Sequence, residues 1–239
     1  MVAGSVVPAK MDLTNEELLL THFNAYILME LGLKDLHVSV SEILDCKDSS
    51  KIPIKNNIHV HIKDHLFRYS QEWVTRYRDI IESIPEIRES FWYSNDWLPI
   101  HAGSFYERFD KSFDRWRILY RSAQRLIENA RVVMDDPTVG SDNRRKLEAK
   151  QEHAIGMRQR DILLNISNKK YGNESEFYVY RYLASEGFLP GYNFTRLPVR
   201  VFLGFRHISK GQYVSRPRFV ALKEFGPNNV IYNNGGKFR

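Results

Sequence analysis

Aromatic and arginine side chains occur together in one short stretch of the chain, GFLPGYNFTRLPVR at 187–200. Tyr192 and Phe194 precede Arg196 and Arg200 in it. Aromatic faces beside guanidinium groups suit the stacked bases and phosphates of a single nucleic-acid strand. They also suit a seam between two domains, because arginine and aromatic residues are enriched at protein interfaces. We favour the seam for the aromatics and nucleic acid for the arginines, and keep all four as candidates.

A second basic motif, SRPRF, places Arg216 and Arg218 on either side of Pro217. If the motif is a strand, alternation points both arginines to one face, and the proline implies an edge strand or a bulge. An ordinary polar strand face is the competing interpretation. With two further cations that extend the set, the candidate nucleic-acid-binding residues are Tyr192, Phe194, Arg196, Arg200, Arg206, Arg216, Arg218 and Lys223.

Charge is distributed unevenly along the 239 residues. The net charge is +6, yet residues 1–176 contain 25 Lys and Arg against 27 Asp and Glu, whereas residues 177–239 contain 10 against 2. Such an asymmetry suggests an anionic partner for the basic part. Alternatively, the acidic complement of a solvated strand surface lies on another domain.

Three histidines, His59, His61 and His65, stand close enough in sequence to suggest a metal cluster. Zinc sites use three or four convergent ligands. If these histidines lie at the start of a helix that begins near residue 61, only His61 and His65 share one face of that helix. We therefore predict solvent-facing histidines and no metal site.

Two further patterns argue against catalysis. Asp110 and Asp114 stand one helical turn apart, but Arg115 and Arg117 beside them indicate a salt-bridged helix surface. In GGKF at 235–238, no Ser or Thr follows the lysine, and no glycine stands at the offset before Gly-Lys that a nucleotide-binding P-loop requires. We predict no catalytic residue and no cofactor in this chain.

Other features bound the class of protein. The sequence holds no apolar run of about 18 residues, the length that a membrane-spanning helix requires. Its first ten residues lack the charged start and apolar core of a signal peptide. A single cysteine, Cys46, excludes an internal disulfide and suits a reducing compartment. We expect a cytoplasmic protein.

The first part of the chain predicts helices. TNEE at 14–17 is a capping box, in which Thr14 accepts a hydrogen bond from the backbone of Glu17, and Gly32 ends the helix that follows. Apolar residues spaced by three and four predict a second helix over 62–84, closed by Pro85.

A pair of long helices follows. SFYE at 104–107 is a second capping box, which opens one continuous helix of about thirty residues towards Pro137. Another helical stretch covers about 143–167. Two long helices joined by a short turn pack antiparallel, so we predict a helical hairpin over about 104–167.

The pattern then changes to short elements. Ser175 can cap a short helix over 176–186 that ends at Gly187, with Phe188 and Leu189 as predicted core residues. Three strands follow, with turn signals between them: VRVFL at 199–203, QYVSRPRFVALKEF at 212–225 and NVIY at 229–232.

These patterns predict an α+β fold in three parts. Residues 1–10 form a linker from an upstream domain, 11–170 a helical domain and 171–239 a small basic α+β region. The last three residues follow a hairpin turn with almost no returning strand, and folded domains usually avoid such an open sheet edge. We therefore interpret the chain as a fragment whose last region is truncated.

Three segments carry a resemblance to a known family: MVAGSVVPAKMDLTNEELLLTHFNAYIL, SEFYVYRYLASEGFLPGYNFTRLPVR and SRPRFVALKEFGPNNVIY. They resemble the region that follows the two RecA-like motor domains of large bacterial DEAD/DEAH-box helicases, and are most similar to the helicases of DISARM-type phage-defence islands. The resemblance covers most of the chain in order and is weakest over 33–100. It identifies a region and not a reaction.

The resemblance implies an accessory role. The intact protein would move along nucleic acid at the expense of ATP, with ATP and magnesium held by the motor domains, and this chain would contact DNA, single-stranded or duplex, and brace those domains. The competing hypothesis is a protein–protein scaffold that docks a second defence protein and never meets nucleic acid.

Overall fold

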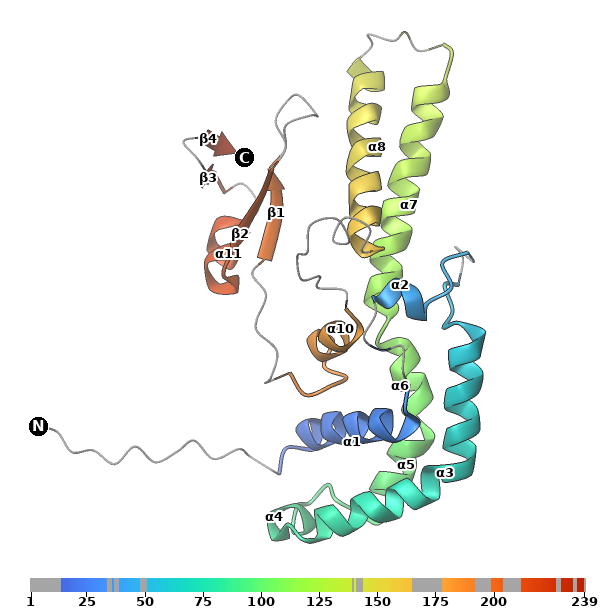
Figure 1. Ribbon diagram of the computed structural model, residues 1–239. Coiled ribbons are helices and arrows are strands. Elements are labelled where there is room, and N and C mark those ends of the chain that lie inside the picture. Colours follow the sequence, from blue (N-terminus) through green and yellow to red (C-terminus); the bar gives the residue numbers. More distant parts are fainter. Residues whose placement is uncertain are drawn as a thin grey trace, which may run out of the picture. The chain divides into compact units, whose positions relative to one another are not determined.

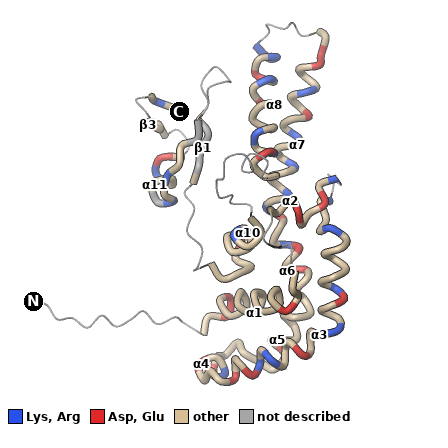
Figure 2. The backbone as a smooth tube through the Cα atoms, viewed as in Figure 1, with Lys and Arg blue, Asp and Glu red and all other residues tan. Residues whose placement is uncertain are grey.

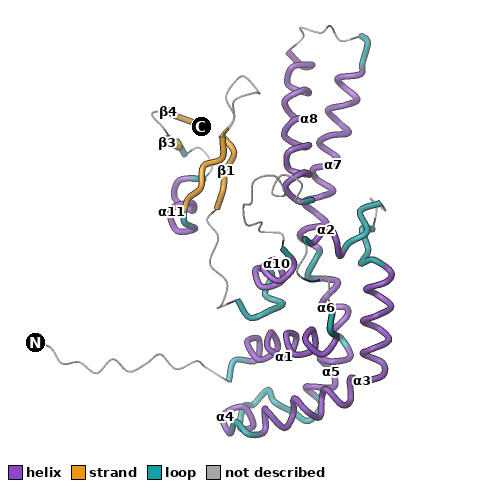
Figure 3. Tube along the Cα trace, in the orientation of Figure 1, coloured by secondary structure: helices purple, strands orange, loops and turns teal. Residues whose placement is uncertain are grey.

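The computed structural model describes residues 14–33, 36, 39–47, 51–138, 140, 144–164, 178–191, 199–203, 212–226, 229–233 and 236–238. These residues are mostly helical, with short antiparallel strand pairs near the end of the chain (Figures 1 and 3). The predicted α+β class is therefore confirmed. The predicted boundary near residue 170 lies outside the described residues and stays a prediction.

The described chain falls into two compact units, divided within one helix between Arg117 and Ile118. The first, which we call the helical unit, comprises the described residues of 14–117 and 178–191. Its helices are α1 (Glu16–Leu31), α2 (Val40–Ile43), α3 (Asn56–Glu82), α4 (Pro85–Arg88), α5 (Trp97–Gly103), α6 (Phe105–Lys111), the start of α7 (Asp114–Asp135), and α10 (Val179–Ser185).

Helix α1 is capped one residue later than predicted, and it begins at Glu16. Asn15, and not Thr14, is the N-cap: its Oδ1 accepts a hydrogen bond from the backbone N of Leu18 at 2.9 Å. The predicted end is confirmed, because Gly32 follows the last turn in the left-handed conformation, with φ 58°, which glycine adopts at little cost.

Helix α3 begins at Asn56, six residues before its predicted start. The carbonyl of Lys55 accepts from the backbone N of Ile58 and of His59, which closes the first turn. Ile58 is buried, so the apolar face extends one turn beyond the pattern seen in the sequence.

The predicted single helix from 104 is two helices, α6 and α7. Ser104 does not cap the first, because its Oγ donates to the carbonyl of Ile100 at 2.8 Å. At the break, the backbone N of Phe113 donates three residues back to the carbonyl of Asp110, in a tight turn. Arg117 donates to that same carbonyl at 2.8 Å, which stabilises the interruption.

The second unit contains the rest of α7 and α8 (Arg144–Leu163), which form the predicted hairpin (Figure 1). The two helices approach closely because small residues line their contact. A Cβ added to Gly156 would lie 2.8 Å from Cγ1 of Ile127 and 3.1 Å from the carbonyl O of Ala123. Near the turn, Nζ of Lys146 donates to the carbonyl of Asp136 at 3.4 Å. Residues 165–167, predicted as helix, lie outside the described part.

Helix α10 starts at Val179, after Tyr178, so it is shorter than predicted; Ser175, its predicted cap, lies outside the described residues. Gly187 follows the helix with φ 75°, in the left-handed region. This turn directs Phe188 and Leu189 inwards, and both are buried as predicted.

The second unit, which contains the hairpin, also holds what we call the C-terminal module: β1 (Val199–Leu203), β2 (Gln212–Arg216), α11 (Arg218–Glu224), β3 (Ile231–Asn233) and β4 (Gly236–Phe238). Strands β1 and β2 pair antiparallel, as do β3 and β4. Its core is small and joins these elements. The core side chains are Val201, Leu203, Val214, Phe225, Ile231 and Phe238.

Two predictions about the module were wrong. The strand expected over 212–225 ends at Arg216, and helix α11 follows, because Pro217 has no N–H for a sheet but suits a helix start: its carbonyl accepts from the backbone N of Ala221. The returning strand judged almost absent is β4, whose three residues pair with those of β3.

Candidate nucleic-acid interface

The structure describes the side chains of three of the eight predicted nucleic-acid-binding residues: Arg216, Arg218 and Lys223. Arg200 lies in β1, where it pairs with Ser215 of β2, but its side chain is outside the described part. The other four predicted residues also lie outside the described part of the chain. They are Tyr192, Phe194, Arg196 and Arg206.

Arg216 is engaged within the module. Its Nε donates to Oε2 of Glu224 on α11 at 2.8 Å, and its Nη2 donates to the carbonyl of Tyr232 on β3 at 3.3 Å. A third bond joins Nη1 to the carbonyl of Ser215. Arg216 therefore ties β2, α11 and β3 together, and the carboxylate of Glu224 partly neutralises its charge.

Arg218 does not share a strand face with Arg216, because it lies in the first turn of α11. The prediction that alternation aligns the two arginines is therefore wrong. Arg218 and Lys223 are both exposed on α11, and Leu222 between them is 82% exposed. Ala221 is buried and faces the module. Helix α11 thus carries two exposed cations, and Figure 2 marks basic positions along its backbone.

Sequence reasoning missed two residues of the module, Tyr232 and Lys237. They are directly opposite each other in the β3–β4 pair, and both are exposed. Their neighbours Ile231 and Phe238 pack into the module's core. Alternation across the NNGG turn could have revealed them, but the stretch after that turn was interpreted as too short to form a strand.

The sequence makes this part of the chain strongly basic. Residues 192–239 contain nine Lys and Arg and a single acidic residue, Glu224. The structure pairs that one carboxylate with Arg216. A phosphate backbone is the polyanion that such a balance suits, since Lys and Arg contacts to phosphate supply most of non-specific nucleic-acid affinity.

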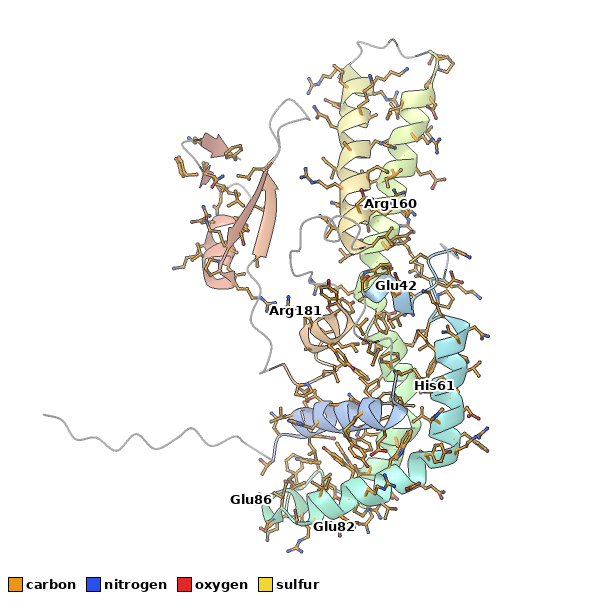
Figure 4. The ribbon with its side chains drawn as sticks, viewed as in Figure 1. Glu42, His61, Glu82, Glu86, Arg160 and Arg181 are labelled. Atoms are coloured by element: carbon orange, nitrogen blue, oxygen red, sulfur yellow. The ribbon has the colours of Figure 1, made fainter. Side chains whose placement is uncertain are left out.

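The prediction that the three histidines face solvent was wrong. Nε2 of His61 (Figure 4) lies 2.8 Å from the carbonyl O of Leu31, and Nδ1 of His65 lies 2.9 Å from the carbonyl O of His61. His59 shares a hydrogen bond of 2.6 Å with the hydroxyl of Tyr106. All three are half-buried. Within the described ranges, no group of three or more His, Cys, Asp and Glu side chains could hold a metal ion.

Asp110 and Asp114 form ion pairs, as predicted, although their partner is buried. Arg117 pairs with both carboxylates and is 5% exposed, and its Nε donates to the carbonyl of Ile52 at 3.0 Å. Ile52 has φ 49°, an unfavourable conformation for a β-branched residue. Arg115 pairs with Glu186 instead. The arrangement stabilises a strained turn, and both aspartates are used in it.

Among the described residues, no helix is long and apolar enough to cross a membrane. No family model, curated protein or solved structure matches the chain.

Proposed function

We propose that this chain is a non-catalytic accessory region of an ATP-dependent DNA helicase in the cytoplasm, of the phage-defence type that its sequence resembles. It contacts nucleic acid and braces the motor domains, which hold ATP and magnesium. The observation that carries the proposal is the charge of the C-terminal fifth of the chain: nine basic residues against one acidic residue over 192–239.

The exposed cations of the C-terminal module support this function. Arg218 and Lys223 project from α11, and Lys237 projects from β4, all three exposed. Cations in solvent are available to phosphates, and each phosphate that they neutralise releases counterions. Glu224, the single acidic residue of 192–239, is paired with Arg216.

A protein–protein scaffold is the second candidate, because the hairpin exposes apolar side chains. Val132 is 69% exposed, Leu147 48% and Ile155 42%. Exposed apolar side chains are typical of surfaces that dock another protein when they lie close together. In this alternative the basic residues never meet nucleic acid.

Binding to DNA at low salt separates the two functions. The purified chain is titrated against a fluorescent single strand and a fluorescent duplex of the same length, from low to physiological salt. An accessory nucleic-acid region binds at low salt and loses affinity as salt rises. A scaffold binds neither DNA even at low salt, and that result would overturn the proposal.

A further inference from the structure

The outward face of the β3–β4 pair combines one aromatic ring with one cation. Tyr232 is 67% exposed, and Lys237, its direct partner in the register, is exposed beside it. Directly opposed residues of an antiparallel pair have Cα atoms roughly 4.5–5.5 Å apart and point to the same side of the sheet. The ring and the ammonium group therefore share one surface.

This surface is held from beneath and from its edge. Ile231 and Phe238, which flank the pair in sequence, point the other way and pack with Leu203 and Val214. The carbonyl of Tyr232 accepts a hydrogen bond from Nη2 of Arg216 at 3.3 Å. Arg216 is fixed in turn by Glu224, so the backbone that carries Tyr232 is tied to both β2 and α11.

We propose that Tyr232 is a stacking platform for one unpaired base of single-stranded nucleic acid, with Lys237 contacting an adjacent phosphate. The inference rests on the proposed function and deepens it, because it selects the single strand over the duplex. In a duplex each base is covered by its neighbours, so an exposed ring finds no free base face. An unpaired strand offers one at every nucleotide, and stacking on it requires no particular sequence.

Four variants of the full chain test the inference by fluorescence anisotropy, with an oligothymidine strand and a duplex of equal length. Tyr232→Ala should weaken single-strand binding by about 5- to 150-fold with little change in salt dependence, since stacking is not an ionic contact. Duplex binding should change less than about twofold. Tyr232→Phe keeps the ring and should bind as the unaltered chain does. Lys237→Ala should flatten the plot of log affinity against log salt by about 0.7 for the single strand.

The matched control is Phe91→Ala, which removes a fully exposed aromatic ring (101%) from the helical unit and should leave binding unchanged. Single-strand affinity that survives Tyr232→Ala, in a protein that still folds, overturns the platform and leaves the proposed function standing. An equal loss for strand and duplex overturns the preference for single strands. If the unaltered chain binds neither DNA at low salt, the proposed function fails as well.

Discussion

The helical unit and the C-terminal module use arginine in opposite ways. In the helical unit, Arg117 is 5% exposed and donates to two carboxylates and two carbonyls. Arg108 donates to Asn24, His101 and Ser104, and burial lowers its pKa to about 10. These cations stabilise the fold.

In the C-terminal module, Arg216 donates to Glu224 and to the carbonyl of Tyr232, while the side chains of Arg218, Lys223 and Lys237 are exposed. The comparison teaches that an excess of cations points to an anionic ligand where those cations reach the surface of the fold.

Removing a buried arginine should give the largest effect. Arg117→Ala leaves the carbonyls of Ile52 and Asp110 without this donor, and the strained turn at Ile52 loses the contact that stabilises it. We therefore expect a loss of about 3 kcal/mol in the free energy of unfolding. Urea denaturation monitored by circular dichroism measures it. The control is Arg115→Ala, whose guanidinium is 67% exposed in its ion pair with Glu186, so its loss should matter by less than about 1 kcal/mol. Equal effects of the two would remove the distinction between buried and exposed arginines.

Close packing in the hairpin should give an intermediate effect. Gly156→Ala places a Cβ 2.8 Å from Ile127 and 3.1 Å from a backbone oxygen, so we expect a loss of about 1–2 kcal/mol although alanine favours helices. Gly103→Ala is the matched control, since a Cβ there meets nothing within 4 Å. Thermal unfolding of both variants measures the two changes in stability. A stabilised Gly156→Ala variant would mean that α7 and α8 do not pack so closely.

Removing Arg216 should give the smallest stability change of the three. It also compares, within the C-terminal module, an arginine bound to protein with the exposed Arg218. We expect Arg216→Ala to cost about 1 kcal/mol, because its ion pair with Glu224 is partly exposed and screened by solvent. The salt dependence of DNA binding should barely change, since this guanidinium contacts protein. A flattening as large as that of Arg218→Ala would show instead that Arg216 contacts phosphate.

Local signals in the sequence predicted much of the fold. Gly32 ends α1, and the strand 199–203 and the pair of long helices follow from turn residues and periodicity. The break before α7 was missed because buried phenylalanines continue at a spacing of four across it. Arg117, which donates to the carbonyl of Asp110 at the break, also donates to the carbonyl of Ile52, 65 residues away, and such a tertiary contact has no local signal.

The candidate site was predicted less completely. Arg218 and Lys223 had the right residue types, but they were assigned to a strand, because alternation and a helical turn look alike over so short a segment. Tyr232 and Lys237 were missed because a three-residue strand carries almost no periodic signal, and only the register of β3 with β4 brings the two together.

The salt dependence of DNA binding by the variant with both Arg218→Ala and Lys223→Ala tests the central claim most directly. If both cations contact phosphates of a single strand, the plot of log affinity against log salt should flatten by about 1.4 relative to the unaltered chain. The control variant carries Arg88→Ala and Lys111→Ala, which remove the same charge from exposed positions of the helical unit and should leave the slope unchanged. Equal slopes for all three folded proteins would contradict the claim that the C-terminal module binds nucleic acid through its exposed cations.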